Sequence, residues 1–230
     1  MTTATVNNKA LTPPREAAVA GIVFSFLMII GLVIIRLGLP DVQVAQNMVN
    51  PGFEKALALA VHLVPFAGIA FLWLLGVLRS RMGAAEDKFF ATVFMGSGLL
   101  FVASLFAASA LVEGVLRGAS SQSAQQISSD VYYFAREASY SFLNVFGIKM
   151  AGVFLFSTCT IALRTGFLPR WIAFFGFACG LALLVIISDW LWIAMLLPIW
   201  TMLVSVYILS VRPPVSEVKV FTTSGTRSHA

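Results

Sequence analysis

Apolar residues fill six long stretches of the chain, and short polar stretches separate them. A transmembrane helix needs about 20 apolar residues, because roughly 30 Å of hydrocarbon is crossed at about 1.5 Å per residue. The pattern therefore predicts an all-α fold, a polytopic bundle of six transmembrane helices. We expect a tail at residues 1–16, a disordered tail at 212–230, and helices at 17–37, 55–78, 89–116, 131–163, 171–187 and 190–211.

Positive charges are distributed unequally between the two sides of this predicted bundle. Ten lysines and arginines fall on the side of the termini, against four on the other side. Because Lys and Arg concentrate in cytoplasmic segments, we expect both termini to be cytoplasmic. The first stretch is longer than the apolar region of a signal peptide, so we expect a retained anchor.

Composition supports a membrane protein and argues against other classes. Hydrophobic residues make up 59% of the 230 residues, and charged residues 11%. The net charge of +5 comes from cations between apolar stretches, so we expect a lipid bilayer as partner and no nucleic acid. The only two histidines are His62, in the second apolar stretch, and His229, in the C-terminal tail. This pair excludes a bis-histidine haem or a multi-histidine zinc site within the chain. We interpret Cys159 and Cys179 as small buried hydrophobic residues. We expect no cofactor or metal.

One motif resembles a segment of known sequences. The stretch "TGFLPRWIAFFGFACG" at residues 165–180 resembles uncharacterised six-helix integral membrane protein families of bacteria, and "EDKFFATVFMGSGLLFVASLF" at 86–106 has a similar character. The resemblance implies a six-helix fold and a bacterial plasma membrane, and it supplies no catalytic residues. Gly166 suits a helix C-cap and Pro169 the start of the next helix.

Ionisable residues at membrane depth are costly, so each is a candidate for function. They are His62, Glu113, Lys149 and Asp189. For Lys149 we expect a structural ion pair with Glu113 from a neighbouring helix; a substrate-binding lysine is the alternative. Arg117 stands four residues after Glu113, the favourable order for an ion pair, which would leave Lys149 facing a cavity or an anionic ligand.

His62 stands one turn before Pro65, which frees a backbone carbonyl within its helix. A lone membrane histidine is most often a hydrogen-bonded packing residue, and a proton relay is the minority interpretation.

A polar stripe precedes Lys149 in the fourth apolar stretch. Its members recur every three or four residues on one helical face: Tyr133, Glu137, Tyr140, Ser141 and Asn144. One interpretation is a set of interhelical hydrogen bonds; the other is a polar pocket that opens outward and ends near Asn144, Lys149 and His62.

Small residues mark faces where helices can approach closely. Gly176 and Gly180 form a GxxxG pattern, and Ala103, Ala107, Ala110 and Gly114 align on the third helix. They favour helix packing within the bundle, in a homo-oligomer or in a larger membrane complex.

Three functions remain in contention. The leading one is a non-enzymatic accessory or assembly subunit, or a small-ligand-binding protein of the plasma membrane. The second is a small transporter or channel whose polar pathway is lined by His62, Glu113 and Lys149. The third is an intramembrane lipid-modifying enzyme, against which the absence of the H-E-x-x-H and G-x-S-x-G motifs counts.

Overall fold

The computed structural model describes residues 13–38, 51–82, 88–120, 129–186 and 191–210. In these ranges the chain is all-helical, and the prediction of a six-helix all-α fold is confirmed. The predicted outer loops, most of the N-terminal tail, the tail at 212–230 and Asp189 lie outside the described residues.

The helices are α1 (Pro13–Gly38), α2 (Pro51–Met82), α3 (Lys88–Ser120), α4 (Ser129–Tyr140), α5 (Ile148–Thr165), α6 (Arg170–Val185) and α7 (Leu196–Ser210). The π-helix η1 (Ser141–Gly147) joins α4 to α5, so these three form one continuous rod. A 3₁₀ helix, η2 (Leu191–Met195), leads into α7.

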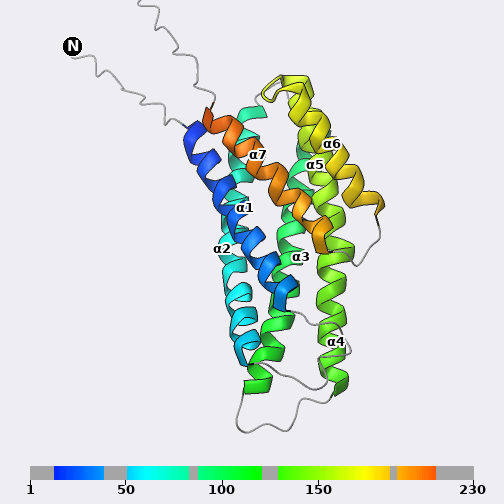
Figure 1. Ribbon diagram of the computed structural model, residues 1–230. Helices are drawn as coiled ribbons and strands as arrows, with labels where there is room; N and C mark the ends of the chain where they lie inside the picture. The colour runs from blue at the N-terminus through cyan, green and yellow to red at the C-terminus, as the bar shows by residue number, and fades with distance from the viewer. Residues whose placement is uncertain (1–12, 39–50, 83–87, 121–128, 187–190, 211–230) are drawn as a thin grey trace, which may run out of the picture.

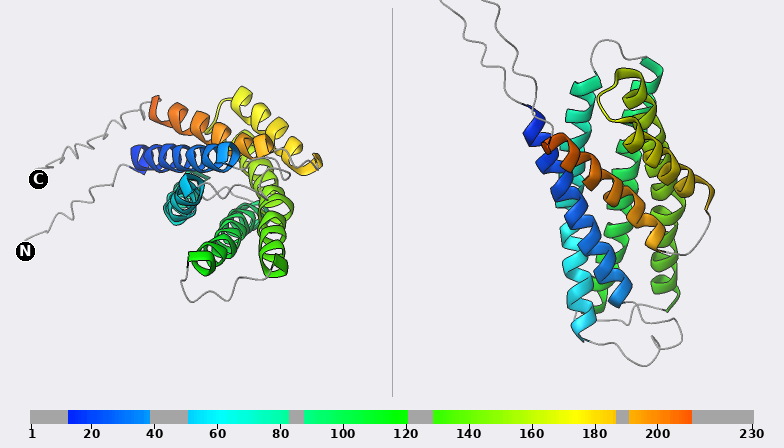
Figure 2. Two further views of the ribbon diagram at one scale, coloured as in Figure 1. Left: turned by 60° about the horizontal axis from the view of Figure 1, so that its bottom comes forward. Right: turned by 45° about the horizontal axis from the view of Figure 1, so that its top comes forward.

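Four helical segments are long and apolar enough to cross a membrane: Lys55–Arg79, Phe89–Arg117, Tyr133–Thr165 and Trp192–Ser210. Two shorter apolar helices accompany them, at Ala18–Ile34 and Arg170–Val185. The N-terminal end of α1 and the C-terminal end of α7 lie at the same end of the bundle (Figure 1). Figure 2 shows α7 crossing beside α1, with α6 on the outer side of α5.

Phenylalanine rings hold the centre of the bundle together. Phe71 of α2 lies 4.8 Å from Phe24 of α1, 5.2 Å from Phe101 of α3 and 5.1 Å from Phe154 of α5, measured between ring centroids. Phe94 stacks on Phe154 at 5.3 Å. All five rings are buried, so four helices share one aromatic core.

Helices α5 and α6 form a hairpin around a tight turn. Gly166 adopts the left-handed conformation at φ 70°, and its N–H donates to the Ala162 carbonyl at 2.9 Å. The predicted C-cap at Gly166 is therefore present, and Pro169 is the residue that caps the start of α6. This backbone conformation favours glycine because a Cβ would be strained there.

Glycines let the two helices of the hairpin approach each other closely. A Cβ on Gly152 would lie 2.8 Å from Cγ of Leu184 and 3.1 Å from the Gly180 carbonyl oxygen. A Cβ on Gly180 would lie 3.2 Å from the Gly152 carbonyl oxygen. Gly176 leaves space for Cys159 and for the indole of Trp200, which donates to the Ile172 carbonyl at 3.2 Å.

We expect Gly152→Ala to lower the free energy of unfolding by about 1–3 kcal/mol, the usual cost of overpacking. The measurement is equilibrium unfolding of the purified protein in detergent. Gly114→Ala is the matched control, because no atom lies within 4 Å of a Cβ built there. Equal effects of the two substitutions would contradict the close approach at Gly152.

Candidate functional site

Lys149 lies at the second residue of α5, and its side chain reaches the C-terminal end of α6. Its Nζ donates to three backbone carbonyls, those of Leu183 at 3.1 Å, Leu184 at 2.9 Å and Ile186 at 3.2 Å. An ammonium group has three N–H donors, so every donor of Lys149 has a partner. The partner of Lys149 is therefore the C-terminal end of α6.

The end of α6 needs such a partner because its last carbonyls have none within the helix. The helix ends at Val185, and Ile186 is extended at φ −75° and ψ 114°. The Ile186 N–H still donates to Ala182, but the chain then leaves the helical path. The following carbonyls are the unpaired acceptors of any helix C-terminus, where the macrodipole also favours a cation.

Helices α5 and α6 differ little in length, so the Lys149 contact lies near the end of the hairpin opposite its turn. From the turn at Gly166, α5 extends over 18 residues and α6 over 16. At about 1.5 Å per residue these are roughly 27 Å and 24 Å, close to the thickness of the hydrocarbon layer of a bilayer, about 30 Å. The hairpin is thus closed at one end by its turn and near the other end by Lys149.

A π-helix directly precedes Lys149, and sequence reasoning missed it. The Ile148 N–H donates to the Leu143 carbonyl, five residues back, which is the π-helical pattern. The Asn144 amide donates to the Tyr140 carbonyl at 3.3 Å. Gly147 is buried, and a Cβ there would lie 3.2 Å from the Phe142 carbonyl oxygen and 3.5 Å from Cβ of Ser104 on α3.

The wider turn of η1 changes which residues share a face. The predicted polar stripe requires a continuous α-helix up to Lys149. The wider π-helical turns change the angular phase between α4 and α5. No feature of "SFLNVFG" predicts the insertion, since the contact of Gly147 with Ser104 of α3, 3.5 Å from a Cβ built on the glycine, is an ordinary van der Waals distance.

Glu113 is held by its own helix. Nε of Arg117 lies 2.6 Å from Oε1 of Glu113, and the side chains are 76% and 23% exposed, respectively. Of the two pairings left open by the sequence, the structure contains the one within α3. Lys149 therefore bonds to the end of α6, whereas Glu113 bonds to Arg117, one turn before the last turn of α3.

His62 lies on an exposed face of α2, and its Nδ1 is 2.6 Å from the Ala58 carbonyl oxygen. A carbonyl only accepts hydrogen bonds, so Nδ1 is the donor in this contact. Pro65 follows on the same exposed face. The side chain of His62 therefore bonds to its own helix rather than to another.

The polar stripe forms part of the surface of α4. Tyr133, Glu137 and Tyr140 are exposed, whereas Ser141 and Asn144 in η1 are half-buried. Nη1 of Arg136 lies 3.3 Å from Oε1 of Glu137. The stripe thus extends from α4 into η1, and Lys149 follows η1 at the start of α5.

The small residues of α3 are placed differently from those of α6. Gly176 and Gly180 are buried against α5 and α7. Ala107 is half-buried, while Ala103, Ala110 and Gly114 are exposed on the surface of α3. The α6 glycines therefore serve the internal packing of this chain, and most of the α3 small residues face outward.

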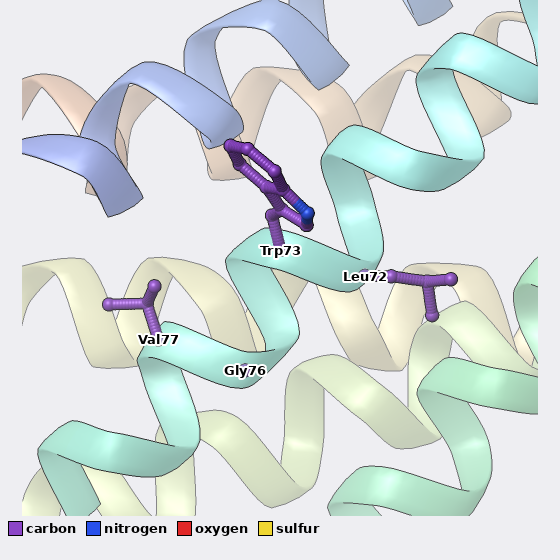
Figure 3. A pocket seen from close by; sticks show the side chains of 4 residues that line it. All are labelled: Leu72, Trp73, Gly76 and Val77. Carbon is purple, nitrogen blue, oxygen red and sulfur yellow. The ribbon is translucent and has the colours of Figure 1, made fainter.

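An apolar depression of about 350 Å³ lies on α2, and none of the polar candidate residues lines it. Figure 3 shows its lining, with Leu72, Trp73 and Val77 spreading around Gly76. Trp73 is 68% exposed, and it belongs to a segment that is long and apolar enough to cross a membrane.

Within the ranges that the structure describes, no cluster of three or more His, Cys, Asp or Glu residues has the arrangement of a metal site.

No protein-family model, curated protein sequence or solved structure matches this chain.

We expect Lys149→Met to lower the free energy of unfolding by about 2–5 kcal/mol. Up to three carbonyls lose their donor, and each unsatisfied buried group costs about 1–3 kcal/mol. Equilibrium unfolding in detergent measures the loss.

Glu113→Gln is the matched control, with an expected loss below about 1 kcal/mol for an ion pair whose cation is largely solvent-exposed. In the Lys149→Met/Glu113→Gln double variant the two losses should add within about 0.5 kcal/mol, as for independent sites. A large coupling energy would show that the two residues interact after all.

Proposed function

We propose that this chain is a multi-pass plasma-membrane protein that crosses the bilayer six times with both termini in the cytoplasm. The arrangement of the helix ends supports this topology. The helix ends at the end of the bundle where α1 begins and α7 ends carry positive residues: Arg79 and Arg81 in the last turn of α2, Lys88 at the start of α3, Arg164 in the last turn of α5 and Arg170 at the start of α6. Lys and Arg concentrate in cytoplasmic segments, so these charges support a cytoplasmic position for that end.

Within that membrane, its function is that of a non-enzymatic accessory or assembly subunit. The observation that carries this proposal is the aromatic core, in which Phe71 contacts Phe24, Phe101 and Phe154 across the centre of the bundle. Rings packed at these distances fill the space that a transport pathway would need. A closed bundle offers its outer faces to partners instead.

The exposed face of α2 is the best surface for such a partner. It presents Phe66, Ile69 and Trp73 at helical spacing, and Gly76 leaves a depression beside them. Aromatic residues supply much of the binding energy at protein interfaces, and a glycine lets another helix approach closely.

A second candidate function, binding of a small ligand, has one favouring observation. The π-helix η1 lies between the exposed polar stripe of α4 and Lys149, and π-helical insertions are frequent at functional sites. Asn144 keeps its amide oxygen available as an acceptor there, since its amide nitrogen is the atom that bonds to Tyr140.

The topology is tested by labelling introduced cysteines with a membrane-impermeant maleimide. We expect Ser123→Cys to react in intact cells and Ser224→Cys to react only after permeabilisation. The native protein is the control, because Cys159 and Cys179 are buried. The reverse labelling pattern would invert the proposed orientation.

The accessory function is tested by a photo-crosslinking amino acid at Trp73 in the native membrane. We expect one discrete protein adduct, identified by mass spectrometry, because this face would contact a partner helix. The same amino acid at Phe174, exposed on α6, is the matched control and should give lipid adducts.

Lipid adducts from both positions would argue against a partner on α2.

The transporter alternative is tested with the purified protein reconstituted in liposomes. It requires a flux of ions or solutes that falls when His62 or Lys149 is substituted. Such a flux would overturn the accessory function.

A further inference from the structure

The C-terminal end of α6 has the chemistry of a binding site for a primary ammonium group. We propose that the carbonyls of Leu183, Leu184 and Ile186 form such a site, and that the ammonium of Lys149 occupies it from within the chain. Where Lys149 is removed, a primary ammonium from the lipid or the solution binds the same carbonyls in its place. This inference is independent of the accessory function.

The geometry matches the three donors of a primary ammonium. The carbonyl oxygens lie 3.1, 2.9 and 3.2 Å from one nitrogen, within the range of N–H···O hydrogen bonds. They come from the last turn of α6 and the extended residue after it, and the helix dipole adds negative potential. Carbonyl oxygens of unwound or terminated helices coordinate small cations in membrane transporters by the same physics.

The contacts select for hydrogen-bond donors as well as for charge. A primary ammonium presents three N–H groups, whereas a quaternary ammonium of equal charge presents none. Replacing Lys149 by alanine removes the three outer methylenes and the nitrogen, so n-propylammonium has the matching shape. Phosphatidylethanolamine carries a primary ammonium and phosphatidylcholine a quaternary one.

The site is open enough for exchange. Lys149 is half-buried, and the bond to Ile186 lies at an exposed position, beside the exposed side chains of Leu181 and Val185. The lengths of α5 and α6 place the carbonyls within several ångströms of a hydrocarbon boundary, which is where lipid headgroups begin. An ammonium from either source can therefore reach them.

The experiment compares thermal unfolding of full-length Lys149→Ala and the native protein in phosphatidylcholine nanodiscs. We expect the variant to lose several degrees in Tm and to regain most of the loss in n-propylammonium chloride. Tetramethylammonium chloride at the same concentration should restore nothing. Native protein and the control Lys55→Ala, which alters an exposed lysine of α2, should respond to neither salt.

A second arm distinguishes the two sources of the ammonium. The variant is moved to nanodiscs that contain phosphatidylethanolamine, without soluble amine. A gain in Tm for Lys149→Ala beyond that of Lys55→Ala identifies the lipid headgroup as a ligand; a gain in propylammonium alone identifies a soluble amine. Either result supports the ammonium site.

Three results would overturn the site: an unchanged Tm in Lys149→Ala, no recovery in either amine, or equal recovery in tetramethylammonium. If the variant does not fold in amine-free buffer, the yield of monodisperse protein is compared after extraction in each salt. Folded protein in propylammonium but not in tetramethylammonium supports the site, and aggregation in both rejects it.

Discussion

Hydrocarbon provides no hydrogen bonds, so each backbone carbonyl at membrane depth must find a partner within the protein. Most helices meet this demand by extending beyond the bilayer before they end. Helix α6 has 16 residues, about 24 Å at ~1.5 Å per residue, which is shorter than the roughly 30 Å of hydrocarbon in a bilayer. Lys149 supplies donors to its last carbonyls from the neighbouring helix. The connection between α6 and α7 can begin there because a charged side chain takes over the role of the missing backbone N–H groups.

That contact depends on how closely α5 and α6 approach, and the approach depends on glycine. Gly152 stands one turn from Lys149, and its Cα faces Gly180 and Leu184. A larger residue there would push the helices apart and lengthen all three hydrogen bonds to Nζ. At the other end of the hairpin, Gly166 holds the tight turn. The aromatic core around Phe71 includes Phe154 of α5 but no residue of α6. Helix α6 packs on α5 through its glycines and through Phe177, whose ring centroid lies 5.2 Å from that of Phe156.

The apolar pattern predicted the six-helix fold because period and length are local properties of the sequence. The partner of Lys149 was not predicted, because a lysine directs a search toward carboxylates, whereas backbone carbonyls are present at every position and leave no mark in a sequence. They become available only where a helix ends, and the apolar stretch continues past Val185 without a Gly or Pro to mark that end. The π-helix η1 was not predicted either, because its i to i+5 hydrogen bonds, such as that from the Ile148 N–H to the Leu143 carbonyl, correspond to no recognisable residue pattern.

The polar side chains of the membrane-compatible helices fall into two groups with different capacities for function. Lys149 and Trp200 bond to another helix, and those bonds use all their N–H donors. His62 and Asn144 bond to a carbonyl one turn back on their own helix, and Asn144 keeps its amide oxygen as an acceptor beyond that bond. An acceptor that faces lipid without a donor is costly, so it favours a partner that supplies an N–H or O–H. Residues such as Lys149 and Trp200 that join helices therefore stabilise the fold, whereas Asn144 has an acceptor that its own helix does not use.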